Sequence, residues 1–146
     1  MPGFIDSVDT MILGATTYAQ SRNYWPFADD QGEYGEKLNR LTKFVASSTL
    51  VEAPWGDFPA ATVTRDPATT IRELKERPGK DVWLWGSLTL MQSLLAAGLV
   101  DEIQLRVCPT SRGTGTRVFE DRQDLKMLEA TPFENGVVLL RYEIKK

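Results

Sequence analysis

A glycine at the end of an apolar run, and the three residues after it, are the first candidates for chemistry. Gly86-Ser87-Leu88-Thr89 follows the run VWLW. A glycine after a strand lets the backbone approach a ligand closely, and the free N–H groups at a helix start favour a phosphate. Ser87 and Thr89 add hydroxyl donors. The spacing matches neither a Walker loop nor a complete G-x-G-x-x-G, and a plain N-cap role for Ser87 is the alternative.

A second candidate is the segment RGTGTRVF at residues 112–119. Its two glycines, Gly113 and Gly115, lie between Arg112 and Arg117. Backbone N–H groups of such a loop can form a concave anion site, and the arginines would add positive charge. The alternative is a flexible turn with solvated arginines.

Hydroxyl and acidic side chains supply two weaker candidates. Ser47, Ser48 and Thr49 follow a short apolar run and could bind a ribose or a phosphate, although turn formation by Ser and Thr also explains them. Asp101 and Glu102 are adjacent acids. Neighbouring residues of a strand point to opposite faces, so these two are not expected to act as a proton-transfer pair.

The composition excludes several classes of site. The 146 residues contain no histidine and one cysteine, Cys108, which rules out His-based triads, the usual zinc sites and an internal disulfide. The net charge of −3 argues against a nucleic-acid or membrane partner. The sequence shows no run long enough to span a membrane and no signal peptide, so a cytoplasmic protein is expected.

Hydrophobic spacing places these segments on alternating strands and helices. Apolar and alternating runs predict strands at residues 10–14, 43–47, 82–85 and 103–107. Helical spacing predicts helices over residues 16–24, from Asp66-Pro67 to Pro78-Gly79, and from residue 88 to Gly98. Asp66 can cap the second of these helices, and Thr70 with Glu73 is a rival capping box. Residues 25–35 and 51–59 are expected to be irregular.

The end of the chain predicts a hairpin. Asn135-Gly136 separates LKMLEATPF from VVLLRYEI, and both turn residues tolerate positive φ. The whole order predicts a single α/β domain over residues 1–146, with a mixed, mostly parallel central sheet, flanking helices and a C-terminal antiparallel hairpin. A ligand is then expected at the carboxyl ends of the parallel strands.

Taken in order, these motifs resemble the dihydrofolate reductase-like superfamily. The branch is the one typified by the C-terminal reductase domain of bacterial riboflavin-biosynthesis deaminase-reductases. The resemblance is carried by Gly86-Ser87, by GLVDE at residues 98–102, by Pro109, and by G-x-G-x-x-x-F ending at Phe119. Upstream, MILGATTY and KFVASSTL are similar to the family's G-R-x-T-Y and K-x-V-x-S-x-T-L. A three-layer fold is implied.

The resemblance also implies a cofactor, NADPH, and a set of residues for it. The implied cofactor-binding residues are Gly14, Thr16, Thr17, Ser47, Ser48, Thr49, Gly86, Ser87, Leu88 and Thr89. Substrate contacts are expected from Arg112, Gly113, Gly115 and Phe119. The implied reaction is hydride transfer to a small pyrimidine or pteridine-like heterocycle, similar to 5-amino-6-(5-phosphoribosylamino)uracil reduction. No residue is assigned as general acid.

Three departures from the family pattern bear on function. Ala15 stands where the family usually has an arginine, which removes a fork of phosphate donors and leaves the preference between NADPH and NADH open. Trp85 precedes Gly86, where riboflavin-pathway reductases often carry an acid. The chain begins at the family's first helix, so the family's first strand, which lies beside residues 82–85, is expected to be absent. The backbone N–H and C=O groups that would then lack a neighbouring strand would favour a homodimer. The alternative function is a non-catalytic, nucleotide-binding or dimerising remnant of the fold.

Overall fold

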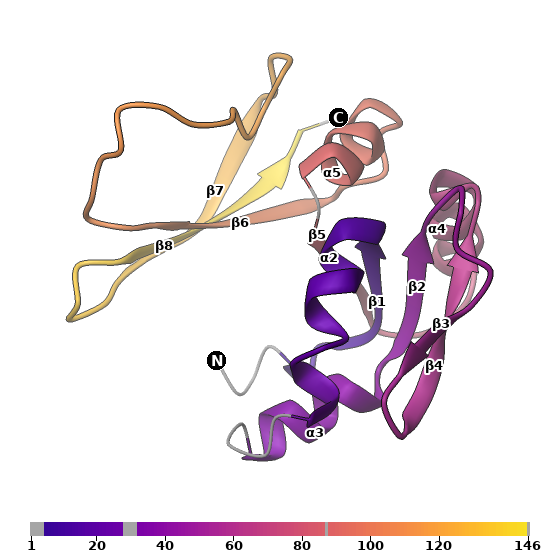
Figure 1. Cartoon of the computed structure of the whole chain (residues 1–146). Coiled ribbons are helices and arrows are strands. Elements are labelled where there is room, and N and C mark those ends of the chain that lie inside the picture. Colours follow the sequence, from indigo (N-terminus) through magenta and orange to yellow (C-terminus); the bar gives the residue numbers. More distant parts are fainter. Residues whose placement is uncertain (1–4, 28–31, 87, 146) are drawn as a thin grey trace. The chain divides into compact units, whose positions relative to one another are not determined.

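The structure is a computed structural model that describes residues 5–27, 32–86 and 88–145 (Figure 1). Ser87, one of the predicted cofactor residues, lies outside the described residues. The chain divides into two compact units, Met1–Met91 and Gln92–Lys146, and each unit is described by itself. No helix of the described residues is both long and apolar enough to cross a membrane.

The first unit is built on a five-stranded sheet in the order β3-β4-β2-β1-β5. Its strands are β1 (Val8–Gly14), β2 (Thr42–Ala46), β3 (Ala53–Trp55), β4 (Phe58–Thr64) and β5 (Asp81–Gly86). Strand β1 pairs in parallel with β2 and β5, and β4 pairs in parallel with β2. Only β3, paired to β4, is antiparallel in this sheet of the described residues. The mostly parallel sheet confirms the predicted class.

Helices connect these strands on both faces of the sheet. They are α2 (Ala15–Ser21), the short 3-10 helix η1 (Trp25–Phe27) and α3 (Gly32–Arg40) between β1 and β2, and α4 (Pro67–Lys75) between β4 and β5. Helix α5 (Leu88–Ala96) follows β5 along the chain. After β1, the chain forms β2 and then β4 on one side of β1 in the sheet. Between β4 and β5 it crosses to the other side of β1, where β5 pairs. Right-handed crossovers in opposite directions place their helices on opposite faces. Figure 1 shows α2 in front of the strands and α4 behind them.

The helix ends follow the predicted capping chemistry. Asp66 Oδ1 accepts the N–H of Thr69 at 3.2 Å and Pro67 is the first helical residue, so Asp66 caps α4, not Thr70. The helix ends at Lys75, before the predicted Pro78-Gly79. At the end of α5, Gly98 has φ +71° and the N–H of Leu99 donates to Leu94 O at 3.0 Å. This is the Schellman arrangement that a terminal glycine favours.

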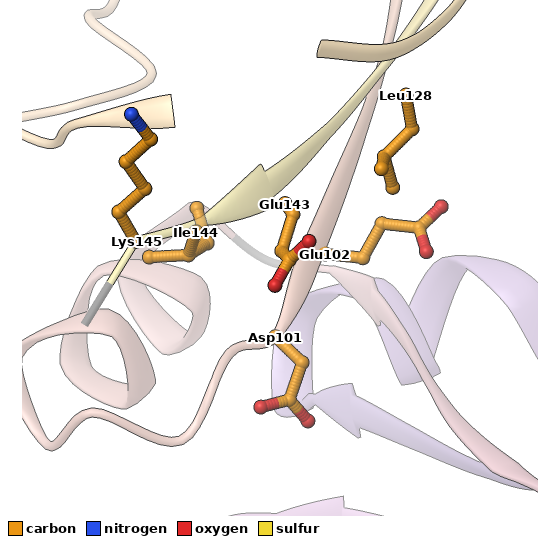
Figure 2. Close-up of a pocket in the computed structure, with 6 residues that line it drawn as sticks. All are labelled: Asp101, Glu102, Leu128, Glu143, Ile144 and Lys145. Carbon is orange, nitrogen blue, oxygen red and sulfur yellow. The ribbon is translucent and has the colours of Figure 1, made fainter. Parts of the chain in front are cut away.

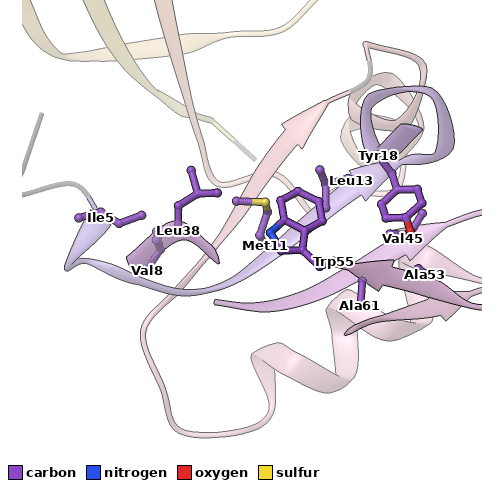
Figure 3. Packing of buried hydrophobic residues seen from close by; sticks show 10 residues of the cluster. All are labelled: Ile5, Val8, Met11, Leu13, Tyr18, Leu38, Val45, Ala53, Trp55 and Ala61. Carbon is purple, nitrogen blue, oxygen red and sulfur yellow. The ribbon is translucent and has the colours of Figure 1, made fainter. Parts of the chain in front are cut away.

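The core of the first unit lies between the sheet and α2 and α3 (Figure 3). Met11 and Leu13 of β1, Val45 of β2 and Trp55 of β3 are fully buried, together with Tyr18 from α2. Ile12, which points to the opposite face of β1, is fully buried as well. Burial on both faces is expected of a central parallel strand and explains the unbroken apolar run MIL.

Two segments predicted to be irregular are partly regular. Residues 51–59 contain β3 and the start of β4, which form a hairpin around Gly56 at φ +54°. The prolines that argued against strands are tolerated because Pro54 is on the edge strand and Pro59 is near a strand start. Helix α3 begins at Gly32, inside the predicted loop of residues 25–35; residues 28–31 are outside the described part.

The second unit contains a three-stranded antiparallel sheet in the order β6-β8-β7. Its strands are β6 (Glu102–Val107), β7 (Leu125–Pro132) and β8 (Val138–Ile144). The predicted hairpin is confirmed, although only one of its two turn residues uses a positive φ. Only Gly136 has positive φ, +89°, and Gly136 N–H donates to Phe133 O at 3.0 Å. Asn135 instead accepts the N–H of Val137 at 3.1 Å, so the loop is a turn closed by a glycine bulge.

Candidate functional site

The topology brings three predicted cofactor segments to one edge of the first sheet. Strands β1, β2 and β5 run parallel and end at Gly14, Ala46 and Gly86. Gly14 lies opposite Ala46, and Leu13 lies opposite Gly86. The chain leaves β1 toward β2 and arrives at β5 on the other side, which makes the β1/β5 boundary a topological switch point. Open α/β sheets bind ligands outside the carboxyl ends of strands at such a point.

Gly86 makes close contact with Thr17 at this edge. Gly86 has φ +145°, and a Cβ at this position would lie 2.7 Å from Thr17 Oγ1 and 3.3 Å from its Cγ2. Both the backbone conformation and the space therefore require glycine. The space that a side chain would fill is taken by Thr17, so the need for glycine is already explained without a ligand. The contact also joins the segment after β1 to the segment after β5.

The residues after β2 form a hydroxyl-capped turn. Ser47 Oγ accepts the N–H groups of Thr49 at 3.1 Å and Leu50 at 3.0 Å. This is the turn-forming role that was the alternative for these residues. Ser48 and Thr49 are exposed. The Ser47 hydroxyl is committed to the turn, and the Thr49 hydroxyl lies 3.5 Å from it, so the exposed residues Ser48 and Thr49 are the ones that a ligand could reach.

Arg65 stands beside this turn and was not among the predicted site residues. Its Nη1 donates to Ser47 O at 2.7 Å, and Ser47 N–H donates to Thr64 O at 3.1 Å. Arg65 is the first residue after β4, whose carboxyl end lies at the same edge as that of β2. A prediction of β4 from the sequence would have made Arg65 a candidate, because ligands bind at the carboxyl ends of parallel strands.

A buried lysine lies near the start of β2, on the α3 side of the sheet. Lys43 is 2% exposed, and its Nζ donates to Asn39 O at 2.7 Å and Leu41 O at 3.0 Å. The ammonium also lies 4.8 Å from the centre of the Trp55 ring. Burial lowers the pKa of Lys43 from 10.5 to about 8. Asn39 Oδ1 in turn accepts Trp55 Nε1–H at 2.7 Å, so this cluster ties α3 to β2 and β3.

Trp85, the departure next to Gly86, is part of an aromatic cluster. Its ring centre lies 5.7 Å from that of Trp25 and 5.6 Å from that of Trp83. All three rings pack on the buried core as half-buried side chains. Asn39 Nδ2 donates to Trp25 O at 2.9 Å, which connects this cluster to that of Lys43. Packing accounts for tryptophan at position 85.

Residues 112–119 belong to the second unit, whereas the predicted cofactor-binding residues belong to the first unit. Arg112, Gly113 and Gly115 are exposed, and Phe119 is half-buried. Gly113 has φ +76°, and no other group of the described residues lies within 4 Å of a Cβ at either glycine. Gln92 Nε2 donates to Arg117 O at 3.2 Å. The segment is an open glycine-containing loop with room for a ligand, which is compatible with both predicted readings.

A pocket of about 450 Å³ lies elsewhere in the second unit and contains none of the predicted cofactor- or substrate-binding residues (Figure 2). It is lined by Asp101, Glu102, Leu128, Glu143, Ile144 and Lys145. Glu102 Oε1 accepts Arg141 Nε–H at 2.7 Å, and Glu129 Oε1 accepts from Arg141 Nη1 at 2.9 Å. Figure 2 shows the Asp101 and Glu102 carboxylates directed away from each other. Their separation agrees with the expectation that Asp101 and Glu102 do not act as a proton-transfer pair.

Comparison with known proteins identifies the family. The RibD C-terminal domain family matches residues 5–139. The uncharacterized protein YyaP of Bacillus subtilis (strain 168) is 31% identical over 145 residues, which cover 95% of this chain and 76% of that protein.

Solved structures share the fold. A candidate riboflavin biosynthesis protein from Shewanella sp. PV-4 superposes with a TM-score of 0.77 at 19% identity, covering all of this chain and 79% of that one. A pyrimidine reductase-like protein from Corynebacterium diphtheriae gives 0.64 at 16% identity, over 94% of this chain and 76% of that one. RibD of Acinetobacter baumannii gives 0.62 at 16% identity, with 94% and 47% covered. From the profile match and the YyaP identity together, the chain belongs to the RibD C-terminal domain family.

Proposed function

We propose that this protein is an NADPH-dependent reductase of a small heterocyclic substrate with a pyrimidine or pteridine-like ring. The observation that carries the proposal is the meeting of three segments, Gly14–Thr17, Ser47–Thr49 and the turn at Gly86, at the switch point of a parallel sheet. Membership of the RibD C-terminal domain family and the fold shared with a pyrimidine reductase-like protein support it.

The residues at this edge fit a dinucleotide. The turn at Gly86 and the first residues of α5, Leu88 and Thr89, would hold the pyrophosphate, because a helix start presents unpaired N–H groups. Ser48 and Thr49 would contact the adenosine half with exposed hydroxyls. NADPH would supply the hydride, while the chain binds and orients the cofactor. The side chains of Arg112 and Phe119 are proposed for the substrate.

The first test of this proposal is a thermal-shift measurement with NADPH and NADH. Ligand at a hundredfold excess over its Kd stabilises a folded protein by about 2.7 kcal/mol, which raises the melting temperature by several degrees. We expect both cofactors to raise it, NADPH more than NADH. No shift at millimolar NADPH would contradict the proposal.

A turnover screen separates the reductase from the alternative of a non-catalytic remnant. NADPH oxidation would be followed with dihydrofolate, pyrimidine intermediates and small carbonyl compounds as acceptors. Substrate-dependent oxidation is the expected result. Cofactor binding without NADPH oxidation in the presence of any acceptor would favour the remnant.

We also propose that the protein is a homodimer. Light scattering of the same preparation, with and without NADPH, measures its mass in solution.

A further inference from the structure

The three strands of the second unit's sheet have one face without a charged side chain. Alternate residues of a strand share a face, and so do residues paired across neighbouring strands. The face consists of the odd-numbered residues of β6, the even-numbered residues of β8, and residues 125, 127, 130 and 132 of β7. None of these residues is charged, and we call this surface the apolar face.

The opposite face of the same sheet carries its charges. Arg141 lies there, and its guanidinium donates to Glu102 Oε1 at 2.7 Å and to Glu129 Oε1 at 2.9 Å. Lys126 and Glu143, which pair between β7 and β8, lie on this face as well. A sheet with one apolar and one charged face is typical of antiparallel strands that are solvated on one side and covered on the other.

Much of the apolar face is nevertheless open to solvent. Val107 of β6 and Met127 of β7 are 51% and 55% exposed. Ala130 and Pro132 of β7 are exposed too, and Leu140 of the central strand β8 is half-buried. Exposed apolar side chains that are contiguous across neighbouring strands mark a surface for interaction, whereas single ones do not.

The chemistry of the apolar face fits a second copy of the same face. It offers no positive charge to a nucleic acid or to anionic lipids, and the whole chain carries a net charge of −3. Two antiparallel sheets pack through their apolar faces at a spacing of about 10 Å, which requires no matching charges. A two-fold axis presents the same surface from both copies, so a face that is apolar throughout is complementary to itself.

The size of the apolar face sets how strong this contact can be. Its strands have 6, 8 and 7 residues, and three strands of this length cover roughly 340 Å² in projection. Ile103 and Ile144 of this face are already buried within the chain. Two copies therefore bury on the order of 700 Å², which is below the roughly 1,200–2,000 Å² of a standard interface. A dimer formed by this face alone should have a Kd on the order of 10–100 µM.

We propose that two copies of this protein associate through the apolar face of the β6-β8-β7 sheet. The inference rests on the proposed homodimer and names the surface that forms it. Burial of exposed side chains such as Val107 and Met127 drives the association, and pairing of strands at a sheet edge is not needed. The contact is reversible because the buried area is small.

The test compares Val107→Lys with the wild-type chain by sedimentation velocity over about 1–500 µM protein. In a two-fold dimer the substitution places two ammonium groups against apolar side chains, so the dimer Kd is expected to rise at least about tenfold. Gln104→Lys is the matched control, because it adds the same charge at an exposed position of the same strand but on the opposite face. Its dimer Kd should change less than about twofold.

The outcomes separate the surface from the homodimer itself. A dimer that Val107→Lys leaves intact would overturn the inference and leave the proposed homodimer standing, and equal weakening by both lysine variants would overturn the inference too. Wild-type protein that stays monomeric at every concentration would overturn both. Met127→Lys, on β7, should weaken the dimer as well and replaces Val107→Lys if that variant does not fold. Sulfate at about 0.5 M should tighten an apolar contact, and a dimer that it weakens would contradict the inference.

Discussion

The two units differ in how they hold their sheets together. In the first unit, β1 is buried on both faces, and Met11, Ile12 and Leu13 are fully buried in succession. In the second unit, the three-stranded sheet leaves Val107, Met127 and Leu128 at 51%, 55% and 43% exposure. The first sheet is held by a packed core, and the second relies more on its strand ladder and on Arg141 with its two glutamates.

This difference bears on where a precise site can be built. Ligand groups need neighbours that do not move, and buried parallel strands provide them. The predicted cofactor segments follow strands of the first unit, while the predicted substrate loop at residues 112–119 is exposed in the second. The comparison leads us to expect a rigid cofactor edge and a more adaptable substrate loop.

The largest expected effect tests whether the core of the first unit dominates stability. Trp55→Ala removes a fully buried ring and leaves Asn39 Oδ1 without its donor. Such substitutions cost about 3–5 kcal/mol in the free energy of unfolding. Leu128→Ala, at an exposed position of β7, is the control and should cost about 0.5 kcal/mol or less. Urea unfolding measures the free energy of unfolding of both variants. Equal losses would contradict the inference that the core of the first unit dominates stability.

The next effect tests whether Gly86 is fixed by its contact with Thr17. Gly86→Ala forces a side chain to φ +145° and to 2.7 Å from Thr17 Oγ1, which is expected to cost roughly 2–4 kcal/mol. Thr17→Ala removes Oγ1 and Cγ2 but keeps the backbone strain. In that background, Gly86→Ala should cost at least about 1 kcal/mol less, by double-mutant cycle. Additive losses would show that the contact does not matter.

The smallest effect concerns pH and the buried amine of Lys43. The folded pKa of about 8 lies below the ordinary 10.5, so between these values the unfolded chain holds more protons and stability rises with pH. The gain should be about 2 kcal/mol between pH 8 and 9.5. Urea unfolding across this range measures it. Lys43→Met should remove this part of the slope, and a variant with the wild-type slope would show that another group titrates.

Local signals in the sequence predicted much of the fold. The apolar run MIL, the cap at Asp66 and the glycine at position 98 each correspond to one structural event, and the structure confirms them. The β3–β4 hairpin was missed because Pro54, Gly56 and Pro59 all resemble loop residues. Their tolerance depends on lying at a sheet edge, which no local pattern reveals.

The site was harder to predict because its contacts join distant segments. Thr17 meets Gly86, and Arg65 meets Ser47, only after the parallel strands align their carboxyl ends. Lys43 reads in the sequence as an exposed charge at a strand start. Its burial results from Asn39 and Trp55 closing over it from α3 and β3. The cofactor-binding roles of the predicted residues stay predictions.

Because Lys43 is buried, the rate of its chemical modification can report how often the first unit opens. At pH 8 about half of these amines carry a lone pair, yet at 2% exposure an acylating reagent cannot reach them. Modification of Lys43 must then wait until α3 and the Trp55 ring move away from it. The rate of Lys43 acylation would be followed by the mass increase of its peptide and compared with the rate for the exposed Lys80. The Lys43 rate would report how often the first unit opens under native conditions.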